Sequence, residues 1–473
     1  MNIRTKIVAT VGPACGGVKV LRRLAEAGVD VFRINFSHGS GEHREEFLRN
    51  VRHVERELGE PLAVMADLCG PKVRVGPIVG GSMLLVAGQE LAIVREAVEG
   101  DPRRISTTLA ELVDEADAGQ ALLLDDGKIR LEVVESCAPR ELRCRVIRGG
   151  VLSGGKGVNL PHTALKLSAL TEKDRRDVDW IASREFDFVA LSFVRSGGDV
   201  RQLRGLLDDR GCGAHIVAKI EKPQALDRIE EIVAAADAIM VARGDLGVEM
   251  DLPAVPAAQK RIARLCQRMG TPCIIATQML ETMTHAPTPT RAEVSDVANA
   301  VLDHADAVML SGETAVGEYP VEAAAMMNRI VQEIQGHYDE TTAPQPVVRP
   351  DCRTTAALAR AVRELCAMED IAAVGVYTAT GTTARMLAKQ RLPQVILAMS
   401  VDEAVVRRTC LYYGVISCLA PAPQHTGDVL ALLEEFAKSV GVARAGQKLA
   451  VLSGRPIGRP GATNTLVVHE VRQ

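Results

Sequence analysis

The sequence is poor in aromatic residues and has no paired cysteine motif. Only 3% of its 473 residues are aromatic, and a single tryptophan is among them. Its eleven cysteines are an odd number and include no C-x-x-C pair. This usage fits free thiols in a reducing cytoplasm better than a disulfide framework. We therefore expect a cytoplasmic protein.

Long apolar runs and an excess of one charge are also absent. No run approaches the ~20 residues that a membrane-spanning helix requires, and the opening residues MNIRTKIVATVGP lack the apolar stretch of a signal peptide. The formal net charge is -4, with lysine and arginine spread along the chain, so nothing favours a nucleic acid or an anionic membrane as a partner. With 47% hydrophobic and 25% charged residues, the composition is typical of a globular enzyme or a large ligand-binding protein.

The chain is long enough for roughly three domains, and most of it alternates between two patterns. Short apolar runs of strand length are followed by stretches of helical period, and Thr171 to Asp174 has the pattern of a helix start. Three runs precede and five follow an interruption of about a hundred residues: 5–12, 29–37, 61–67, 186–194, 215–222, 237–247, 272–280 and 306–314. Eight βα units predict an α/β protein with a (β/α)8 TIM barrel. Two doubly wound sheets are the alternative.

The interruption, residues 70–167, has short alternating segments separated by Gly or Asp-Gly turns. We expect it to form a small β-barrel domain. Because it follows the third strand, it would leave the barrel at its C-terminal rim and could close there as a lid. The barrel would then comprise residues 1–69 and 168–340. A Pro- and Thr-rich linker is expected at 341–353 and a C-terminal αβ domain at 354–473.

Polar side chains follow six of the eight expected strands, at the C-terminal ends where such barrels carry their chemistry. Lys219 and Glu221 are two apart in an extended strand, so they face the same side. Alone, this pair is as compatible with mutual neutralisation as with function, but six such strand ends favour function. In chain order the set is Arg33, Asn35, Ser37, His38, Asp67, Lys219, Glu221, Arg243, Gly244, Asp245, Thr277, Ser311 and Glu313.

Two carboxylates in this set, Glu221 and Asp245, could hold Mg²⁺, which takes one or two carboxylates and completes its shell with water and substrate phosphate. Thiolates are missing from these strand ends, which disfavours zinc. Arg33 and Lys219 are candidate clamps on a phosphoryl group, and backbone N–H groups near Gly244 are candidates for binding an anion. The residues predict phosphate or carboxylate chemistry with Mg²⁺ in a lidded barrel and do not name the substrate.

Ten stretches of the sequence together resemble the pyruvate kinase family. They are TKIVATVGPA, FRINFSHG, GKGVNLP, LTEKD, DFVALSFVRS, AKIEK, MVARGDLGVE, ATQMLETM, PTRAEVSDVANAV and DAVMLSGETAVGEYPVEA, and they cover nearly the whole chain in the family's order. The resemblance implies Mg²⁺-dependent transfer of a phosphoryl group from phosphoenolpyruvate to ADP, giving pyruvate and ATP in the last step of glycolysis. It also implies a barrel with an inserted lid and a C-terminal regulatory domain, Mn²⁺ as a possible substitute for Mg²⁺, and a homotetramer.

The resemblance further implies roles for the strand-end residues around the phosphate. Arg33 would bind the transferring phosphate, and Lys219 would stabilise it in flight. Glu221 and Asp245 would bind Mg²⁺. Gly244 and Asp245 would also meet the substrate carboxylate through their backbone N–H groups.

Proton delivery and nucleotide binding are implied in the same way. Thr277 would bind substrate and help to deliver a proton to the enolate, together with Ser311 and water, because a hydroxyl alone has the wrong pKa for an efficient acid. The nucleotide would be held by Asn35, Phe36, Ser37 and His38 in the barrel and by Arg74 and Lys156 in the lid.

The C-terminal domain contains TATGTTARMLAK, with threonines around Gly381 at an expected helix start. This resembles the family's loop for the phosphate of an allosteric effector and fits anion binding at a helix N-terminus; ordinary N-capping is the alternative. A second stretch, SGRPIGRPGATNT, resembles the effector-closing loop, with Arg455 where many members have tryptophan. The expected effector residues are Thr378, Thr380, Thr382, Thr383, Arg455 and Arg459.

A lysine marks a departure from the family pattern just after the third strand. Many members that need K⁺ have Asp-Thr-Lys-Gly-Pro-Glu where this chain reads DLCGPK, ending in Lys72. Asn35, Ser37 and Asp67 still match the K⁺ ligands of the family. Because an ammonium supplies a +1 charge and repels K⁺, we expect Lys72 to replace the monovalent cation and the enzyme to be K⁺-independent.

Two other functions stay open on the sequence alone. One is a Mg²⁺-dependent barrel lyase acting on phosphoenolpyruvate or pyruvate, which the ADP-binding residues of the lid argue against. The other is a catalytically inactive sensor of sugar phosphates, which the intact set of catalytic residues argues against. Formation of ATP from phosphoenolpyruvate and ADP would distinguish all three.

Overall fold

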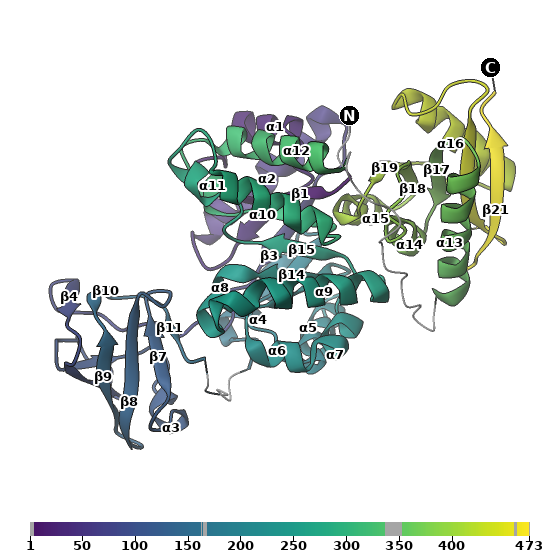
Figure 1. Ribbon diagram of the computed structural model, residues 1–473. Coiled ribbons are helices and arrows are strands. Elements are labelled where there is room, and N and C mark those ends of the chain that lie inside the picture. The colour runs from purple at the N-terminus through teal and green to yellow at the C-terminus, as the bar shows by residue number, and fades with distance from the viewer. Residues whose placement is uncertain (1–3, 162, 164–167, 336–351, 458–460, 473) are drawn as a thin grey trace.

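The computed structural model describes residues 4–161, 163, 168–335, 352–457 and 461–472, in three bodies side by side (Figure 1). The central body is a closed barrel of eight parallel strands in the order β1-β16-β15-β14-β13-β12-β3-β2. This topology confirms the predicted barrel and excludes two doubly wound sheets. The strands are β1 (Lys6–Val11), β2 (Val31–Asn35), β3 (Ala63–Asp67), β12 (Phe188–Leu191), β13 (His215–Ile220), β14 (Ala238–Ala242), β15 (Cys273–Ala276) and β16 (Ala307–Leu310).

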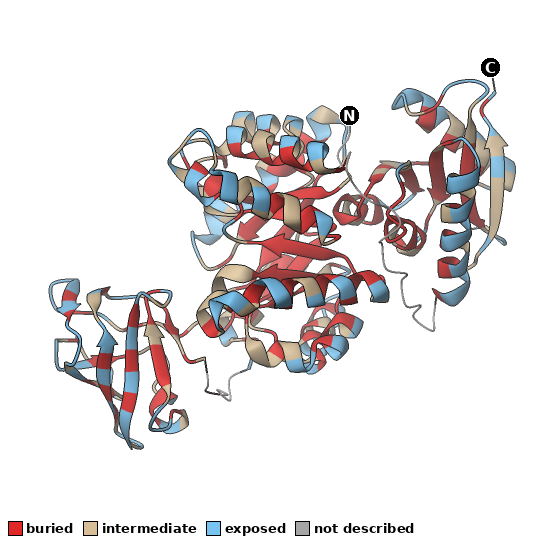
Figure 2. Ribbon diagram, viewed as in Figure 1, coloured by how far each residue is buried: buried red, intermediate tan, exposed pale blue. Residues whose placement is uncertain are grey.

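The apolar strands are buried on both faces, which explains their nearly continuous hydrophobic runs (Figure 2). Alternate residues such as Val8 and Met65 fill the barrel interior, while Ile7 and Val64 pack outward under the helices. The surrounding helices are α1 (Val18–Glu26), α2 (Gly41–Leu58), α4 (Glu172–Ala182), α5 (Gly197–Asp208), α6 (Pro223–Asp227), α7 (Ile229–Ala235), α8 (Arg243–Glu249), α9 (Val255–Met269), α10 (Arg291–Leu302), α11 (Gly312–Ala315) and α12 (Pro320–Gln335), with 3₁₀ turns at Leu252–Ala254 and Glu281–Thr284.

The helix start predicted at Thr171 is confirmed. The Thr171 hydroxyl accepts from the Asp174 N–H, and the Asp174 carboxylate accepts from the Thr171 N–H, forming a capping box on α4. Two predicted strands instead end early. Residues 243–249 and 312–315 form the short helices α8 and α11. The polar residues there therefore lie on helices that follow the C-terminal ends of β14 and β16.

The insert after β3 is mostly β, as expected, with one short helix. Strands β11, β7, β8, β9, β5 and β6 form one sheet, and β10 pairs with β4. Isolated bridges from Arg74 to Gly157 and from Val75 to Thr107 join the two edges of the larger sheet, which curls it toward a small barrel. The elements are β4 (Ser82–Leu85), β5 (Glu90–Val94), β6 (Arg104–Ser106), α3 (Leu112–Glu115), β7 (Ala121–Leu124), β8 (Ile129–Cys137), β9 (Glu141–Arg148), β10 (Gly150–Ser153) and β11 (Val158–Asn159).

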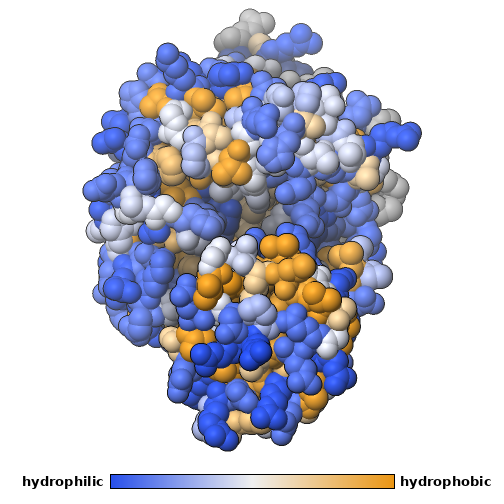
Figure 3. Space-filling view, turned by 90° about the vertical axis from the view of Figure 1, so that its left-hand side faces the viewer, coloured by the Kyte–Doolittle hydropathy of each residue, from blue (hydrophilic) through white to orange (hydrophobic). Residues whose placement is uncertain are grey.

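The outer end of the insert exposes apolar side chains, which gather on the face turned toward the viewer in Figure 3. Leu84 and Val151 lie opposite each other on β4 and β10 and are both more than half exposed. None of the helices in the described part of the chain is long and apolar enough to cross a membrane.

The C-terminal body is an αβ domain with a five-stranded sheet in the order β19-β18-β17-β20-β21. The apolar runs at 371–379, 394–400, 448–454 and 463–471 predict β17, β18, β20 and β21, whereas β19 was not predicted. The elements are α13 (Arg353–Met368), β17 (Ile371–Tyr377), α14 (Thr382–Ala388), β18 (Val395–Ser400), α15 (Glu403–Arg408), a 3₁₀ turn (Thr409–Leu411), β19 (Val415–Leu419), α16 (Thr426–Ser439), β20 (Lys448–Gly454) and β21 (Thr463–Glu470). Most of the expected linker, 341–351, lies outside the described residues.

A buried charge cluster attaches this domain to the N-terminal end of the barrel. Lys389, just after α14, lies 2.5 Å from the Asp306 carboxylate, and Arg391 lies 3.1 Å from it. All three side chains are at most 1% exposed. The Arg391 guanidinium also stacks 4.2 Å above the ring of Tyr413. The cluster lies at the end of the barrel opposite to the polar strand ends.

Candidate active site

Two cations meet at one carboxylate where β2, β3 and β13 end. Arg33 Nε donates to Asp67 Oδ2 at 2.6 Å, and Lys219 Nζ lies 3.2 Å from Asp67 Oδ1. Arg33 Nη1 also donates to the Thr10 hydroxyl at 2.9 Å, on the neighbouring strand β1. Asp67 is 1% exposed. Parallel strands carry these side chains to the same rim, so residues far apart in sequence form one cluster.

Lys219 connects this cluster to Glu221. Its ammonium lies 2.8 Å from Glu221 Oε1 and donates to the Ser192 hydroxyl at 2.8 Å. Ser192 in turn donates to the Leu68 carbonyl at 2.8 Å. Ser192 is a residue that the sequence reasoning missed. It follows the fourth strand, so the rule that selected the other strand ends would have found it.

Burial disfavours the charged form of each group in this cluster, and the nearby ion pairs oppose that effect on each pKa. For Lys219, burial lowers the pKa, but the carboxylates of Asp67 and Glu221 outweigh it and leave the pKa raised. For Asp67, burial raises the pKa, and the charges of Arg33 and Lys219 bring it below its usual value. For Glu221, burial raises the pKa, and Lys219 reverses this only in part because Asp245 adds a negative charge nearby. Glu221 therefore gains from a further cation.

Glu221 and Asp245 fit the donor set of a Mg²⁺ site. The negative charge of Asp245 is one cause of the raised pKa of Glu221, after burial, so a cation near the two carboxylates would relieve their repulsion. Asp245, on α8, is partly exposed. No group of three or more His, Cys, Asp or Glu residues that could hold a metal occurs in the described part of the chain. Two carboxylates plus water and substrate oxygens are the usual shell of Mg²⁺.

Lys72 lies beside this pair of carboxylates. Its ammonium is 3.9 Å from Asp245 Oδ1. Within the described residues it makes no hydrogen bond or ion pair with the three side chains that match the family's K⁺ ligands, namely Asn35, Ser37 and Asp67. The Asn35 side chain instead accepts from the Ser37 N–H at 3.0 Å.

Thr277 is held in a strained backbone conformation at the end of β15. Its φ is 68°, in a region that a β-branched residue rarely adopts. Its hydroxyl accepts from the Gly244 N–H at 2.7 Å and donates to the Ala276 carbonyl at 2.6 Å. Arg243 fixes the same turn, because it donates to the Thr277 carbonyl at 2.8 Å while paired with Asp296 at 2.7 Å. The Thr277 hydroxyl and the first turn of α8 are therefore one unit.

Ser311 follows β16 and has a buried hydroxyl with no hydrogen-bond partner among the described residues. Its N–H donates to Glu313 Oε2 at 2.7 Å, and Glu313 Oε1 accepts from the Leu280 N–H at 3.1 Å. Glu313 therefore fixes the loop, while the Ser311 hydroxyl is left for a water or a ligand.

The loop after β2 brings His38 near the cations of the cleft. Burial, and then the charges of Arg74, Lys72 and Arg33, lower the pKa of His38 below its usual value, which keeps it neutral at pH 7. Phe36 is fully buried against Trp180 at 5.7 Å between ring centroids. Its ring therefore supports the loop from beneath.

Comparison with known proteins identifies the family of this chain. The model of the pyruvate kinase barrel domain matches residues 2–324, and that of the pyruvate kinase alpha/beta domain matches residues 356–469. The chain belongs to the pyruvate kinase family. It is 42% identical to a pyruvate kinase of Agrobacterium vitis, over 99% of this chain and 97% of the relative. It is 40% identical to one of Geobacillus stearothermophilus, over 100% of this chain and 81% of the relative.

A solved pyruvate kinase from Cryptosporidium parvum has the same fold. The two structures superpose with a TM-score of 0.94 at 31% sequence identity, over 99% of this chain and 96% of that one. The family and the fold class expected from the sequence are therefore confirmed, and the enzyme is a pyruvate kinase.

The two lid residues expected to hold nucleotide make their contacts within the lid. Arg74 donates to the Gly155 carbonyl at 2.9 Å, and Lys156 lies 2.8 Å from Asp125. Both side chains are exposed toward solvent in part.

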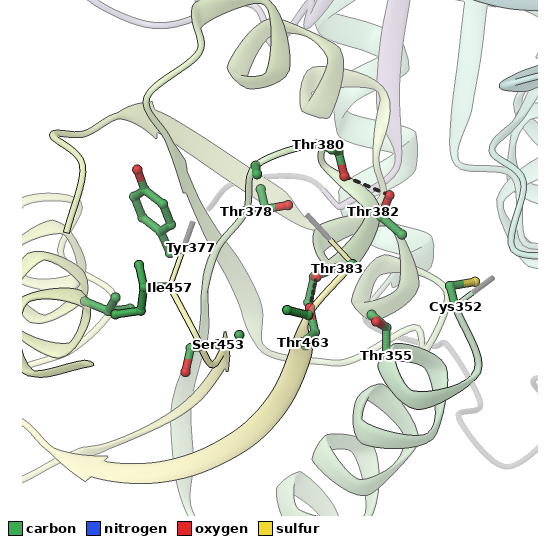
Figure 4. A pocket seen from close by; sticks show the side chains of 15 residues that line it. Cys352, Thr355, Tyr377, Thr378, Thr380, Thr382, Thr383, Ser453, Ile457 and Thr463 are labelled. Carbon is green, nitrogen blue, oxygen red and sulfur yellow. Dashed lines mark hydrogen bonds between the residues drawn. The ribbon is translucent and has the colours of Figure 1, made fainter. Parts of the chain in front are cut away.

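The expected effector threonines line a cavity of about 170 Å³ in the C-terminal domain (Figure 4). The Thr380 and Thr382 hydroxyls lie 3.0 Å apart, and Thr383 contacts Thr463 on β21 at 2.7 Å. The Thr378 hydroxyl accepts from the Gly381 N–H at 2.9 Å. No side chain caps α14, so simple N-capping does not account for these threonines. Arg455 is exposed and does not line the cavity, and Arg459 lies outside the described residues.

Proposed function

We propose that the enzyme transfers the phosphoryl group of phosphoenolpyruvate to ADP, with Mg²⁺ bound by Glu221 and Asp245. The observation that carries this proposal is the convergence of Arg33 and Lys219 on Asp67, at 2.6 and 3.2 Å, beside those two carboxylates. Phosphoryl transfer depends on positioning and on neutralising charge, and this cluster supplies both. Bound Mg²⁺ would supply further positive charge to the phosphoryl oxygens and to the substrate.

The chain's own residues account for the remaining steps. Arg33 and Lys219 orient the phosphoryl group while its bond to the enolate oxygen breaks and a bond to an ADP phosphate oxygen forms. The Asp245 N–H, at the start of α8, would face the substrate carboxylate, and the Gly244 N–H would do so only by exchanging its contact with the Thr277 hydroxyl. The enolate carbon then takes a proton through the Thr277 and Ser311 hydroxyls and water. Arg74 and Lys156 hold ADP from the lid side, against Asn35, Ser37 and His38 and the backbone of Phe36.

Formation of ATP from phosphoenolpyruvate, ADP and Mg²⁺ tests the proposal. We expect turnover by the native chain and a loss of roughly 10³-fold in kcat for Lys219→Met, which keeps the aliphatic stem but removes the charge. Lys438→Met, which removes a surface lysine of the C-terminal domain, is the matched control. Absence of ATP would refute the proposal. Release of pyruvate by carbon–carbon cleavage of a larger carboxylic acid, without ADP, would then favour a lyase, and sugar-phosphate binding without turnover would favour a sensor.

We also propose that the enzyme needs no K⁺, because Lys72 already supplies a monovalent charge. The support is the position of its ammonium, 3.9 Å from Asp245 at the edge of the metal-binding pair. Activity at fixed ionic strength should be the same in Na⁺- or Tris-based buffer with and without K⁺. Lys72→Glu should lose activity without K⁺ and recover part of it when K⁺ is added. Severalfold activation of the native enzyme by K⁺ would contradict the proposal.

We propose, finally, that the threonine-lined cavity binds the phosphate of an allosteric effector, in a regulatory domain that begins near residue 354. The hydroxyls and the short helix α14 provide donors for a phosphate. A sugar phosphate should raise the apparent affinity for phosphoenolpyruvate, and Thr382→Val with Thr383→Val should abolish this effect. An unchanged response in the double variant would exclude the cavity. The lid boundaries at 70 and 167 are proposed on the sequence pattern of the insert, and a homotetrameric assembly is proposed on the family resemblance.

A further inference from the structure

A buried carboxylate at the end of α8 connects the lid to the substrate side of the barrel. Glu249 is the last residue of α8 and is 2% exposed. Its Oε1 atom accepts from Asn159 Nδ2 at 2.7 Å and forms an ion pair with Lys222. Asn159 belongs to β11, the strand by which the chain leaves the lid, and Lys222 directly follows Glu221. One carboxylate therefore holds three segments together.

The energetics of this contact favour a defined geometry. Glu249 Oε2 is buried and has no hydrogen-bond partner among the described residues, so the cost of burying the carboxylate is offset only at Oε1. Removing one of its two partners leaves a buried charge less compensated. Lys222 is itself mostly buried and lies 5.9 Å above the ring of Phe193. Small movements of any one segment would thus be resisted by the other two.

The residues on either side of this contact are those of the proposed reaction. Asn159 is three residues from Lys156, and the adjoining Gly157 forms a backbone bridge to Arg74. On the other side, α8 begins with the turn that carries Gly244 and Asp245. Only a seven-residue helix separates the lid contact from the substrate end. The entering strand of the lid has a separate anchor, because the Gly70 N–H donates to Asp174 at 3.2 Å.

We propose that Glu249 is a positioning residue that couples the lid to α8. By holding Asn159 and Lys222 on one carboxylate, it sets the position of the lid's nucleotide-binding residues relative to Gly244 and Asp245. The inference rests on the proposed phosphoryl transfer. Its consequence is that loss of the Asn159 contact affects ADP before phosphoenolpyruvate, whereas loss of the Glu249 charge affects both substrates.

Steady-state kinetics with two matched variants test the coupling. Asn159→Ala removes the lid contact and leaves the pair of Glu249 and Lys222. We expect its KM for ADP to rise roughly tenfold, the loss expected for one hydrogen bond to a charged group, with the KM for phosphoenolpyruvate within twofold of the native value. Thr163→Val is the control. Its hydroxyl is buried in the same returning segment but donates at 2.6 Å to Gln120, inside the lid, so both KM values should be unchanged.

Two further variants separate positioning from simple stability. Glu249→Gln should raise the KM for both substrates. Glu249→Asp shortens the acidic side chain by one methylene, and Asn159→Gln lengthens the amide side chain by one methylene. Each alone should raise the KM for ADP, and the double variant should recover most of the native value. A purely structural role would lower the melting temperature of both single variants without this selective recovery.

Hydrogen–deuterium exchange gives a readout that does not depend on turnover. Backbone amides of residues 155–161 should exchange faster in Asn159→Ala than in Thr163→Val. If the native chain makes no ATP, the proposed function fails while this comparison still reports on the contact. Equal exchange in the two variants, or equal KM values for ADP, would overturn the coupling.

Discussion

At the scale of single residues, Thr277 shows how the site combines strain with function. A β-branched residue with φ of 68° is unfavourable by roughly 1–3 kcal/mol, and the fold supplies that energy through the surrounding contacts. This conformation places the Thr277 hydroxyl where it accepts a hydrogen bond from the Gly244 N–H at 2.7 Å. A glycine or asparagine would suit the backbone better but would lose this contact.

Two substitutions separate the hydroxyl of Thr277 from its branched shape. Thr277→Val keeps the shape and the strain but removes the hydroxyl, so we expect kcat/KM for phosphoenolpyruvate to fall about 10²-fold. The melting temperature should fall as well, because the Gly244 N–H loses its acceptor. Thr277→Ser keeps the hydroxyl and relieves the branch, so activity should stay within about threefold and the melting temperature should rise slightly. Equal activity of the two variants would show that the hydroxyl has no role.

The sequence predicted the positions of some site residues better than those of others. Arg33, Asp67 and Lys219 were predicted to share a rim because parallel strands end together, and the structure brings them into contact. Ser192 was missed although it follows its strand in the same way, and the strand-end rule applied to the fourth strand would have identified it. The direction of Lys72 was beyond prediction, because a long side chain after a Gly-Pro turn can reach either Asp67 or Asp245.

At the scale of elements, two helices begin with the same capping box but differ in what else the box holds. On α4, Thr171 and Asp174 cap the helix, and Asp174 also accepts from the Gly70 N–H at the root of the lid. On α5, Ser196 and Asp199 form the same box, and Asp199 also accepts from the Arg195 N–H. The second box is therefore local, whereas the first connects to the insert.

This difference predicts unequal costs for matching substitutions. Thr171→Ala and Ser196→Ala should each lower the free energy of unfolding by about 1 kcal/mol, the usual cost of losing a cap. Asp174→Ala should cost more than Asp199→Ala, because Asp174 is fully buried and releases Gly70 as well. Hydrogen exchange of residues 68–72 should accelerate in Asp174→Ala and stay unchanged in Asp199→Ala. Similar acceleration in both would contradict the link to the lid.

Local patterns predicted most elements but not their ends. The eight barrel strands follow from apolar runs that are buried on both faces. Residues 243–247 were expected to continue the strand that begins at 237, although the chain turns into α8 at Arg243. Strand β19, with Ser417 and Cys418 among apolar residues, lacks a clear period and was missed for that reason.

At the scale of the whole molecule, the lid and the C-terminal domain contact opposite ends of the barrel (Figure 1). The order of the domains could be predicted, because it follows the chain. Their attachment could not, because Asp306 and Lys389 are 83 residues apart and neither has a local signature of a partner. The same holds for the Asn159 contact with Glu249, which joins residues 90 apart. Contacts between polar residues so far apart in the sequence leave no local sequence pattern, so they could not be predicted.

The attachment of the C-terminal domain rests on the carboxylate of Asp306. Asp306→Asn would leave Lys389 and Arg391 buried without a counter-charge, which costs about 3–5 kcal/mol in comparable buried pairs. We expect this variant to unfold in two calorimetric transitions, the earlier one from the released C-terminal domain. Glu369→Gln is the control, because it removes an exposed pair with Lys448 at 2.6 Å within the same domain and should change the melting temperature little. A single transition at the native temperature in Asp306→Asn would show that the apolar contacts between the bodies suffice to hold them together.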